Sequence, residues 1–258
     1  IAAVTGIMAY AGFVAFKGPD NNGDKEKLIL KAVLTMMQQV HFKNPPLDDN
    51  FSHRLYDTYM DRLDGMKRFL IMEDLDLLDD YQDSLDDQIR NEDLKFFEIS
   101  YKLINNSIEK TRKWYPELLS QPFDFTIKDS IETDGEKRSY AKDDAELKEF
   151  WRSYLKYETL TRLSDKIKEQ ETATEVPEGG KKSVAELEAD ARKDVLEVFD
   201  EWYERMDKVR RSDRFEMYVN SITNVYDPHS DYFNPKEKED FDINMSGRLE
   251  GIGARLQM

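Results

Sequence analysis

The chain has 258 residues, and 38 Lys and Arg against 54 Asp and Glu give it a formal net charge of −16. This charge argues against nucleic-acid binding, because a strongly acidic surface repels phosphate backbones. Cysteine is absent, which excludes disulfides, thiolate metal sites and a cysteine nucleophile, and three histidines leave little scope for a histidine-rich metal site. With 39% hydrophobic and 12% aromatic residues, the chain can build a packed core, so we expect it to fold.

The first segment is apolar throughout. Residues 1–16, IAAVTGIMAYAGFVAF, contain no charge and lack the polar stripe of a soluble surface helix. The segment is long for a signal-peptide core and shorter than the roughly 20 residues that span a bilayer. We therefore expect residues 1–17 to be a signal peptide or a membrane anchor of an exported protein, and a buried core helix is the alternative. Cleavage after the small-x-small triplet 9–11 and retention as an anchor both stay open.

The dominant period between residues 24 and 226 is helical, which predicts a mainly all-α, multi-helix domain. The first amphipathic stretch covers 28–40 and stops before Pro45, because proline lacks a backbone N–H and disfavours helix in the residue before it. Asp49 or Ser52 can cap the helix that follows. That helix is expected to end at Asp64-Gly65.

Two further helical stretches follow. Apolar residues over 78–89 form one stripe, and the acidic run 73–87 is interpreted as the solvated face of the same amphipathic helix. The pattern of 94–108 continues as far as Tyr115-Pro116, where we expect the proline to break the helix.

The pattern changes at residues 123–140, where apolar and polar residues alternate on the way to Asp134-Gly135, a dipeptide typical of tight turns. This predicts a short hairpin or an irregular excursion. Helical periodicity resumes over 147–163, and residues 171–182 form a polar loop with proline and two glycines. Helices then start at two further places. One has the S-x-x-E capping signature of Ser183 and Glu186, and the other begins at about Ser212 and runs to Asp227-Pro228.

Alternating acidic residues at two places are how a calcium-binding loop begins, namely Asp20-Asn22-Asp24 and Asp74-Asp76. Neither pattern continues with the glycine that the turn needs or with the bidentate glutamate that closes the loop. We therefore expect no metal site. The chain also has no Walker loop, no dinucleotide fingerprint and no G-x-S-x-G elbow, so no cofactor is expected.

The three histidines give no catalytic pattern. His41 and His53 are expected at helix ends, where the ring can meet water or a terminal carbonyl. Asp227, His229 and Ser230 are the residue types of a Ser-His-Asp triad, but a triad needs side chains that converge from separate segments. We therefore expect His229 to cap a helix or stabilise a turn.

The tail 227–258 contains a specific series of residues: Asp227, Pro228, His229, Ser230, Tyr232, Phe233, Pro235, Phe241 and Gly251-Ile252-Gly253. This series resembles the junction of carboxy-terminal processing proteases, where a helical leader gives way to a PDZ domain. Residues 56–76, 121–125 and 150–163 also resemble blocks of the amino-terminal helical domain in the tail-specific protease branch of that family.

The resemblance implies an exported serine endopeptidase with a Ser-Lys dyad in a core that follows the PDZ domain. None of the family's catalytic residues maps onto this sequence. By the same resemblance, we expect residues 227–258 to be the junction and the first PDZ strand. It further implies that the loop Gly251, Ile252, Gly253 and Ala254 holds a substrate's terminal carboxylate through backbone N–H groups. We expect the chain alone to be inactive.

The expected function is thus a non-catalytic helical scaffold and docking region of a periplasmic tail-specific protease. The implied partners are protein substrates with free apolar C-termini, an adaptor protein or membrane complex, and the inner membrane through residues 1–16. The alternative is a stand-alone exported helical adaptor or chaperone-like binding module. The two differ because only the first requires a PDZ domain and a serine-lysine core downstream.

Overall fold

The computed structural model describes residues 22–173 and 180–246, and over this part the chain forms α-helices and no strand. The prediction of a mainly all-α fold is therefore confirmed for the described part. The segment 1–17 and the loop Gly251–Ala254 lie outside it. The helices are α2 (Asn22–Val40), α3 (Asp49–Asp64), α4 (Met72–Asp79), α5 (Leu85–Arg90), α6 (Lys95–Leu119), α7 (Asp144–Thr172), α8 (Val184–Asp207), α9 (Arg211–Tyr226) and α10 (Pro235–Ser246).

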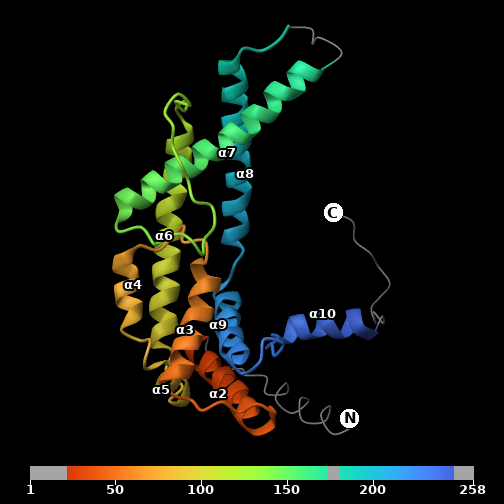
Figure 1. The fold of residues 1–258 in the computed structure, drawn as a ribbon. Coiled ribbons are helices and arrows are strands. Elements are labelled where there is room, and N and C mark those ends of the chain that lie inside the picture. Colours follow the sequence, from red (N-terminus) through yellow and green to blue (C-terminus); the bar gives the residue numbers. More distant parts are fainter. Residues whose placement is uncertain (1–21, 174–179, 247–258) are drawn as a thin grey trace.

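The helices form an elongated bundle along α6, which contacts α4, α7, α8 and α9 (Figure 1). At one end, α2, α3 and α5 pack together with α9. At the other end, α7 and α8 form a hairpin whose tips project beyond the remaining helices (Figure 1). Helix α9 follows α8 after the short link 208–210 and continues down the same side of the bundle.

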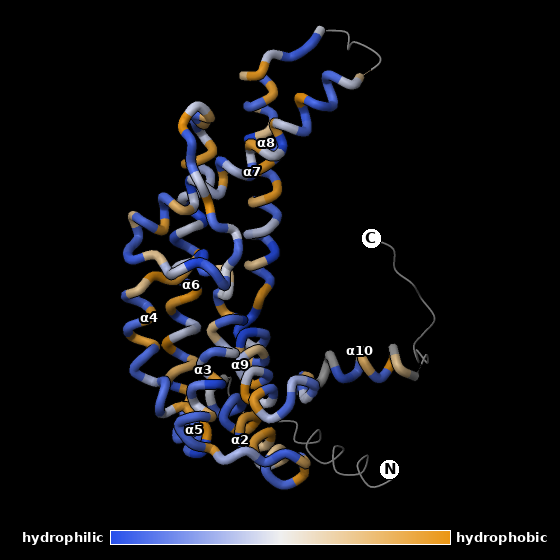
Figure 2. The backbone as a smooth tube through the Cα atoms, viewed as in Figure 1, coloured by the Kyte–Doolittle hydropathy of each residue, from blue (hydrophilic) through white to orange (hydrophobic). Residues whose placement is uncertain are grey.

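The core forms because each helix presents an apolar stripe to its neighbours, and orange and blue residues accordingly alternate along the tube in Figure 2. Where α3, α6 and α9 meet, aromatic side chains fill the interior. Tyr59 lies edge-on to Phe96 at 5.5 Å and to Tyr218 at 5.2 Å, and Phe97 stacks on Tyr218 at 5.6 Å. All four side chains are buried, so this layer holds the three helices together.

A second aromatic layer joins α6, α7 and α8. The fully buried Trp151 contacts Phe199 and Trp202, with ring centroids 5.8 and 6.2 Å away, and its indole N–H donates to the carbonyl of Arg68 at 2.9 Å. A buried indole N–H needs such an acceptor. Trp151 thus ties α7 both to α8 and to the link between α3 and α4.

The caps at two helix starts differ in how well sequence predicts them. Ser183 and Glu186 form the predicted capping box, with Glu186 N donating to Ser183 Oγ at 3.3 Å and Ser183 N to Glu186 Oε2 at 2.8 Å. The prediction that Asp49 or Ser52 caps α3 is wrong, because Asp48 accepts from Phe51 N at 3.0 Å.

Ser52 has another role because it faces the interior. Its hydroxyl donates to Asp86 Oδ1 at 2.8 Å and accepts from the N–H of the same residue at 2.9 Å. Asp86 is only 4% exposed and also pairs with Arg90 at 3.0 Å. The acidic run 73–87 is therefore not one solvated helix face: it divides between α4 and α5, and one of its carboxylates is buried with partners.

Helix α6 does not end at Pro116 as expected but continues to Leu119. Proline removes one hydrogen bond, to the carbonyl of Arg112, and the last turn is held by tertiary contacts instead. Tyr115 stacks on Tyr203 at 4.8 Å and donates to Asp200 at 2.6 Å, and Leu119 is buried. Packing on α8 therefore outweighs the local preference of the proline.

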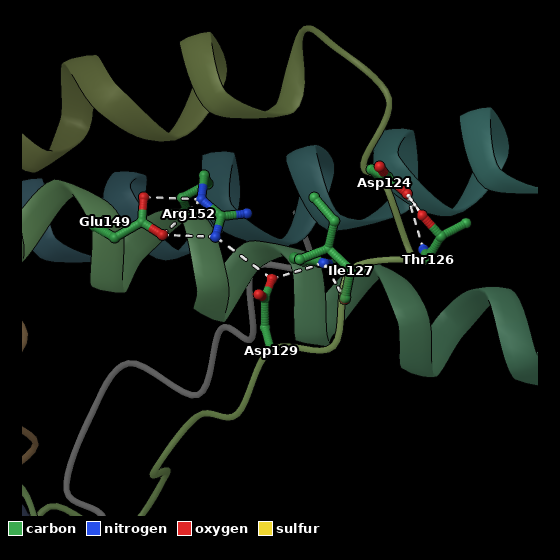
Figure 3. A network of polar contacts seen from close by, with 7 residues as sticks. Asp124, Thr126, Ile127, Asp129, Glu149 and Arg152 are labelled. Carbon is green, nitrogen blue, oxygen red and sulfur yellow. Dashed lines mark hydrogen bonds and ion pairs between the residues drawn. The ribbon is translucent and has the colours of Figure 1, made fainter.

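The excursion between α6 and α7 is irregular, so the hairpin alternative is wrong. Its one described pairing is an isolated parallel bridge between Ile71 and Ala141. Two side chains of α7 hold this segment. Lys156 Nζ donates to Ile127 O at 3.1 Å and to Asp129 Oδ2 at 2.7 Å. Arg152, which bonds Glu149 at 2.6 Å, also reaches Asp129 Oδ2 at 3.5 Å (Figure 3). Hydrogen bonding from Lys156 lowers the pKa of Asp129. Lys156, which is only 7% exposed, thus holds this segment on α7 where a hairpin would be held by hydrogen bonds between strands.

Candidate functional site

The candidate site is the segment 227–234, which connects α9 to α10 and is the part of the described chain that carries the junction motif. It lies against α9 because that helix has three polar side chains four residues apart, which places them on one face. We call these residues the polar stripe of α9: Glu216, Asn220 and Asn224.

Asn220 holds the middle of the segment. Its Oδ1 accepts from the N–H of Tyr232 at 2.6 Å, and its Nδ2 donates to the carbonyl of Tyr232 at 3.1 Å. A side-chain amide has one donor group and one acceptor, so it can satisfy both backbone groups of an extended residue as a neighbouring strand does. The backbone of Tyr232 is therefore fixed on α9 without a β-sheet.

The other two members of the polar stripe hold the ends of the segment. Asn224 Nδ2 donates to Ser230 O at 2.8 Å, and Arg62 of α3 in turn donates to Asn224 Oδ1. Asn234 Nδ2 donates to Glu216 Oε2 at 2.7 Å. Residues 230, 232 and 234 thus bond to residues 224, 220 and 216 of α9, in reverse order along the helix. The chain after α9 therefore runs back antiparallel to it.

The end of α2 reaches the same segment through His41. Its Nε2 lies 3.2 Å from Ser230 Oγ, its Nδ1 lies 2.7 Å from the carbonyl of Lys43, and its ring lies edge-on to Tyr226. A serine nucleophile also needs free oxyanion donors. The N–H of Ser230 is already donated to the carbonyl of Asp227 at 3.0 Å, so we interpret the contact with His41 as structural.

The remaining motif residues form the turn and the start of the next helix. The N–H of Asp227 donates to the carbonyl of Thr223 at 3.2 Å at the end of α9, and Pro228 and His229 lie exposed at the tip of the turn. Pro235 is the first residue of α10. The loop Gly251-Ile252-Gly253-Ala254 lies outside the described residues.

Sequence reasoning missed two parts of this site. The polar stripe of α9 interrupts an apolar pattern at four-residue spacing, which is a signal that polar side chains face another segment. Helix α10 was also missed, although Pro235 followed by acidic residues is a helix-start pattern. Within α10, Phe241 stacks on Phe233 with ring centroids 5.6 Å apart, and both are nearly half exposed.

The start of α9 is fixed by an ion-pair network. Arg211 contacts Glu26 of α2, at 2.6 Å between Nη2 and Oε2, and also donates to Glu98 of α6. These carboxylates raise the pKa of Arg211, so it stays charged. Because a cation joins three helices here, the position of α9, and with it that of the polar stripe, is set by the bundle.

A buried carboxylate organises the link between α3 and α4. Asp64, 4% exposed, accepts from the N–H groups of Arg68, Phe69 and Leu70 at 2.8 to 3.0 Å. Burial raises its pKa to about 6, against the lowering effect of these hydrogen bonds. Lys67 inside this link has a positive φ of 51°, a conformation that the carboxylate helps to hold.

No group of three or more His, Cys, Asp or Glu side chains in the described ranges has the arrangement of a metal site. Asp74 accepts from the N–H of Ile71 at 3.1 Å, as a helix cap. His53 lies near the start of α3 with its ring about half exposed, and its Nε2 lies 2.7 Å from Asp83 Oδ1. Within residues 22–173 and 180–246, no helix has both the length and the apolar character needed to cross a bilayer.

The fold and its junction define an all-α domain that ends in a segment fixed to its last bundle helix. The family model of the tail specific protease N-terminal domain matches residues 33–236, which begin in α2 and end at the start of α10. The chain therefore belongs to this family, and the resemblance to tail-specific proteases is confirmed.

A curated relative is the tail-specific protease of Haemophilus influenzae, which is 25% identical over 236 residues. The alignment covers 91% of this chain and 31% of the relative, so the chain spans about a third of that protein's length.

Proposed function

We propose that the chain is the non-catalytic helical scaffold of a tail-specific serine endopeptidase that degrades or processes proteins from their C-termini. The family membership and the name of the relative support this proposal. The Ser-Lys dyad that the resemblance implies has no counterpart on these residues. The chain then contributes position and docking, and peptide-bond cleavage belongs to a further part of the protease.

The observation that carries the proposal is the attachment of residues 230–234 to the polar stripe of α9. Asn220 satisfies both backbone groups of Tyr232, and Asn224 and Glu216 hold the residues on either side. Such a contact sets the direction in which the chain leaves the bundle. A scaffold needs this property, because the chain then enters α10 from a point that the bundle fixes and not from a loose linker.

The proposal includes partners and location. Substrates are proteins with free apolar C-termini, which the loop Gly251–Ala254 would help to bind once a complete PDZ domain surrounds it. An adaptor protein or membrane complex can dock on the helical surface. The periplasm is the expected location, supported by the uncharged segment 1–16, which would direct export or hold the protein in the inner membrane.

A stand-alone helical adaptor or chaperone-like module is the second candidate. It shares the all-α fold and the uncharged segment 1–16, but it gives no reason for a junction fixed at three positions of α9. The family match favours the protease scaffold, because the matched region includes that junction.

The test compares the 258-residue chain with a protein in which the same chain is followed by the PDZ domain and serine-lysine core that the proposal requires. Both are incubated with an unfolded protein that has an apolar free C-terminus, and with the same protein amidated at its C-terminus. We expect cleavage by the longer protein alone, sensitive to amidation. Serine-dependent cleavage by the 258-residue chain would contradict the scaffold role, and inactivity of both proteins would contradict the protease assignment.

A further inference from the structure

Helix α2 is apolar on more of its circumference than the bundle covers. Leu30, Leu34 and Met37 are buried against the other helices. A second series recurs every four residues on an adjacent face and remains exposed: Leu28, Ala32, Met36 and Val40. Leu28, Met36 and Val40 are 46%, 42% and 59% exposed, and Phe42, just beyond the helix, is 83% exposed. We call Leu28, Ala32, Met36, Val40 and Phe42 the outer face of α2.

Basic residues lie at both ends of this face. Lys25 is exposed near the start of α2, and Lys43 follows Phe42 with its Nζ 5.6 Å from the ring centroid. An apolar face with lysines at its borders is the composition of helices that lie in a membrane interface. The net charge of −16 disfavours the other occupant, a second copy of the chain, because two such copies repel each other.

The position of α2 in the chain also favours a bilayer. The uncharged segment 1–16 is separated from α2 only by residues 17–21. Five residues span at most about 18 Å when fully extended. If segment 1–16 attaches the protein to a bilayer, the start of α2 must therefore lie close to the lipid surface.

We propose that the outer face of α2 docks on the surface of a lipid bilayer, with the helix lying parallel to the membrane and Phe42 inserted among the acyl chains. This inference rests on the membrane attachment included in the proposed function. It deepens that proposal by giving the bundle an orientation: α2 faces the lipid, and the hairpin of α7 and α8 projects from the opposite end of the bundle (Figure 1).

The absence of cysteine allows a direct test. A single fluorophore is attached in the full chain to Met36→Cys, and in a matched protein to Leu77→Cys on α4, a leucine that is 52% exposed. Zwitterionic vesicles of phosphatidylcholine and phosphatidylethanolamine carry a nitroxide quencher on the acyl chains, so that the net charge of −16 does not repel the protein from the bilayer. We expect the label at position 36 to lose roughly half of its emission and the label at 77 to be unaffected.

A second variant keeps the test independent of the label. Phe42→Ser in the Met36→Cys background is expected to reduce the quenching at position 36, with the far-UV circular dichroism unchanged. Flotation of each protein with the same vesicles reports membrane attachment separately. Flotation with quenching at position 36 that Phe42→Ser reduces supports the docking.

Three outcomes would overturn the inference. Flotation without quenching at position 36 refutes docking by α2 and leaves membrane attachment intact. No flotation at all refutes the attachment itself. Burial of the label at position 36 without vesicles, growing with protein concentration, shows that a second copy covers this face.

Discussion

The two halves of α7 differ in what they pack against, although they belong to one continuous helix. The first half contributes Trp151 and Leu155, both fully buried, to the core that runs through the bundle. The second half contributes Leu163 to a separate small cluster with Leu187 and Ala191. Secondary structure is the same in both halves, so we expect the helix to differ in stability along its length because of packing and not because of helix propensity.

The largest expected effect follows from this difference. Leu155→Ala removes a side chain from the continuous core and should lower the free energy of unfolding by about 4 kcal/mol, whereas Leu163→Ala should cost about 2 kcal/mol because its cluster is small and can relax. Urea unfolding of both variants measures the two values. Equal losses at the two positions would show that the hairpin tips are as firmly packed as the bundle.

The hairpin of α7 and α8 and the remaining bundle also differ in the environment of their carboxylates. Glu186 in the α8 cap is exposed, and hydrogen bonding to Ser183 lowers its pKa. Asp64 is buried in the bundle, and its pKa is raised to about 6 from the ordinary 3.8. A raised pKa means that the folded state binds more protons than the unfolded state between these values. Stability from Asp64 must therefore decrease as the pH rises from about 4 to 6.

Asp64→Asn tests this sign, because asparagine does not titrate. The unfolding free energy of the native protein minus that of Asp64→Asn should fall by about 2 kcal/mol between pH 4 and pH 6 and should be level above pH 7. Measuring both proteins cancels the titration of the other carboxylates. A difference that rises over the same interval would mean that the three backbone hydrogen bonds outweigh the burial of the carboxylate.

Most of the helices could be predicted from the sequence because their apolar residues recur at helical spacing. Local signals also located features that depend on few residues, such as the Ser183 cap and the end of α3 at Gly65. These are interactions between residues close in the chain, for which one sequence contains all the information needed.

The errors concern contacts between distant segments. Pro116 remains in α6 because Tyr115 and Leu119 pack on other elements, and Asp86 is buried because Ser52 offers it a partner. Hydrophobic periodicity contains no information on such partners. The junction motif was recognised through family resemblance, whereas its attachment to Asn220 depends on the chain turning back at Pro228.

The central claim is that the bundle holds the junction, and hydrogen exchange at the amide of Tyr232 tests it most directly. This N–H donates to Asn220 Oδ1, so we expect it to exchange slowly in the native chain and about tenfold or more faster in Asn220→Ala. Asn105→Ala is the matched control, since Asn105 bonds only the carbonyl of Tyr101 within its own helix, among the contacts described. Fast exchange in the native chain, or equal exchange in all three proteins, would contradict a junction fixed on α9.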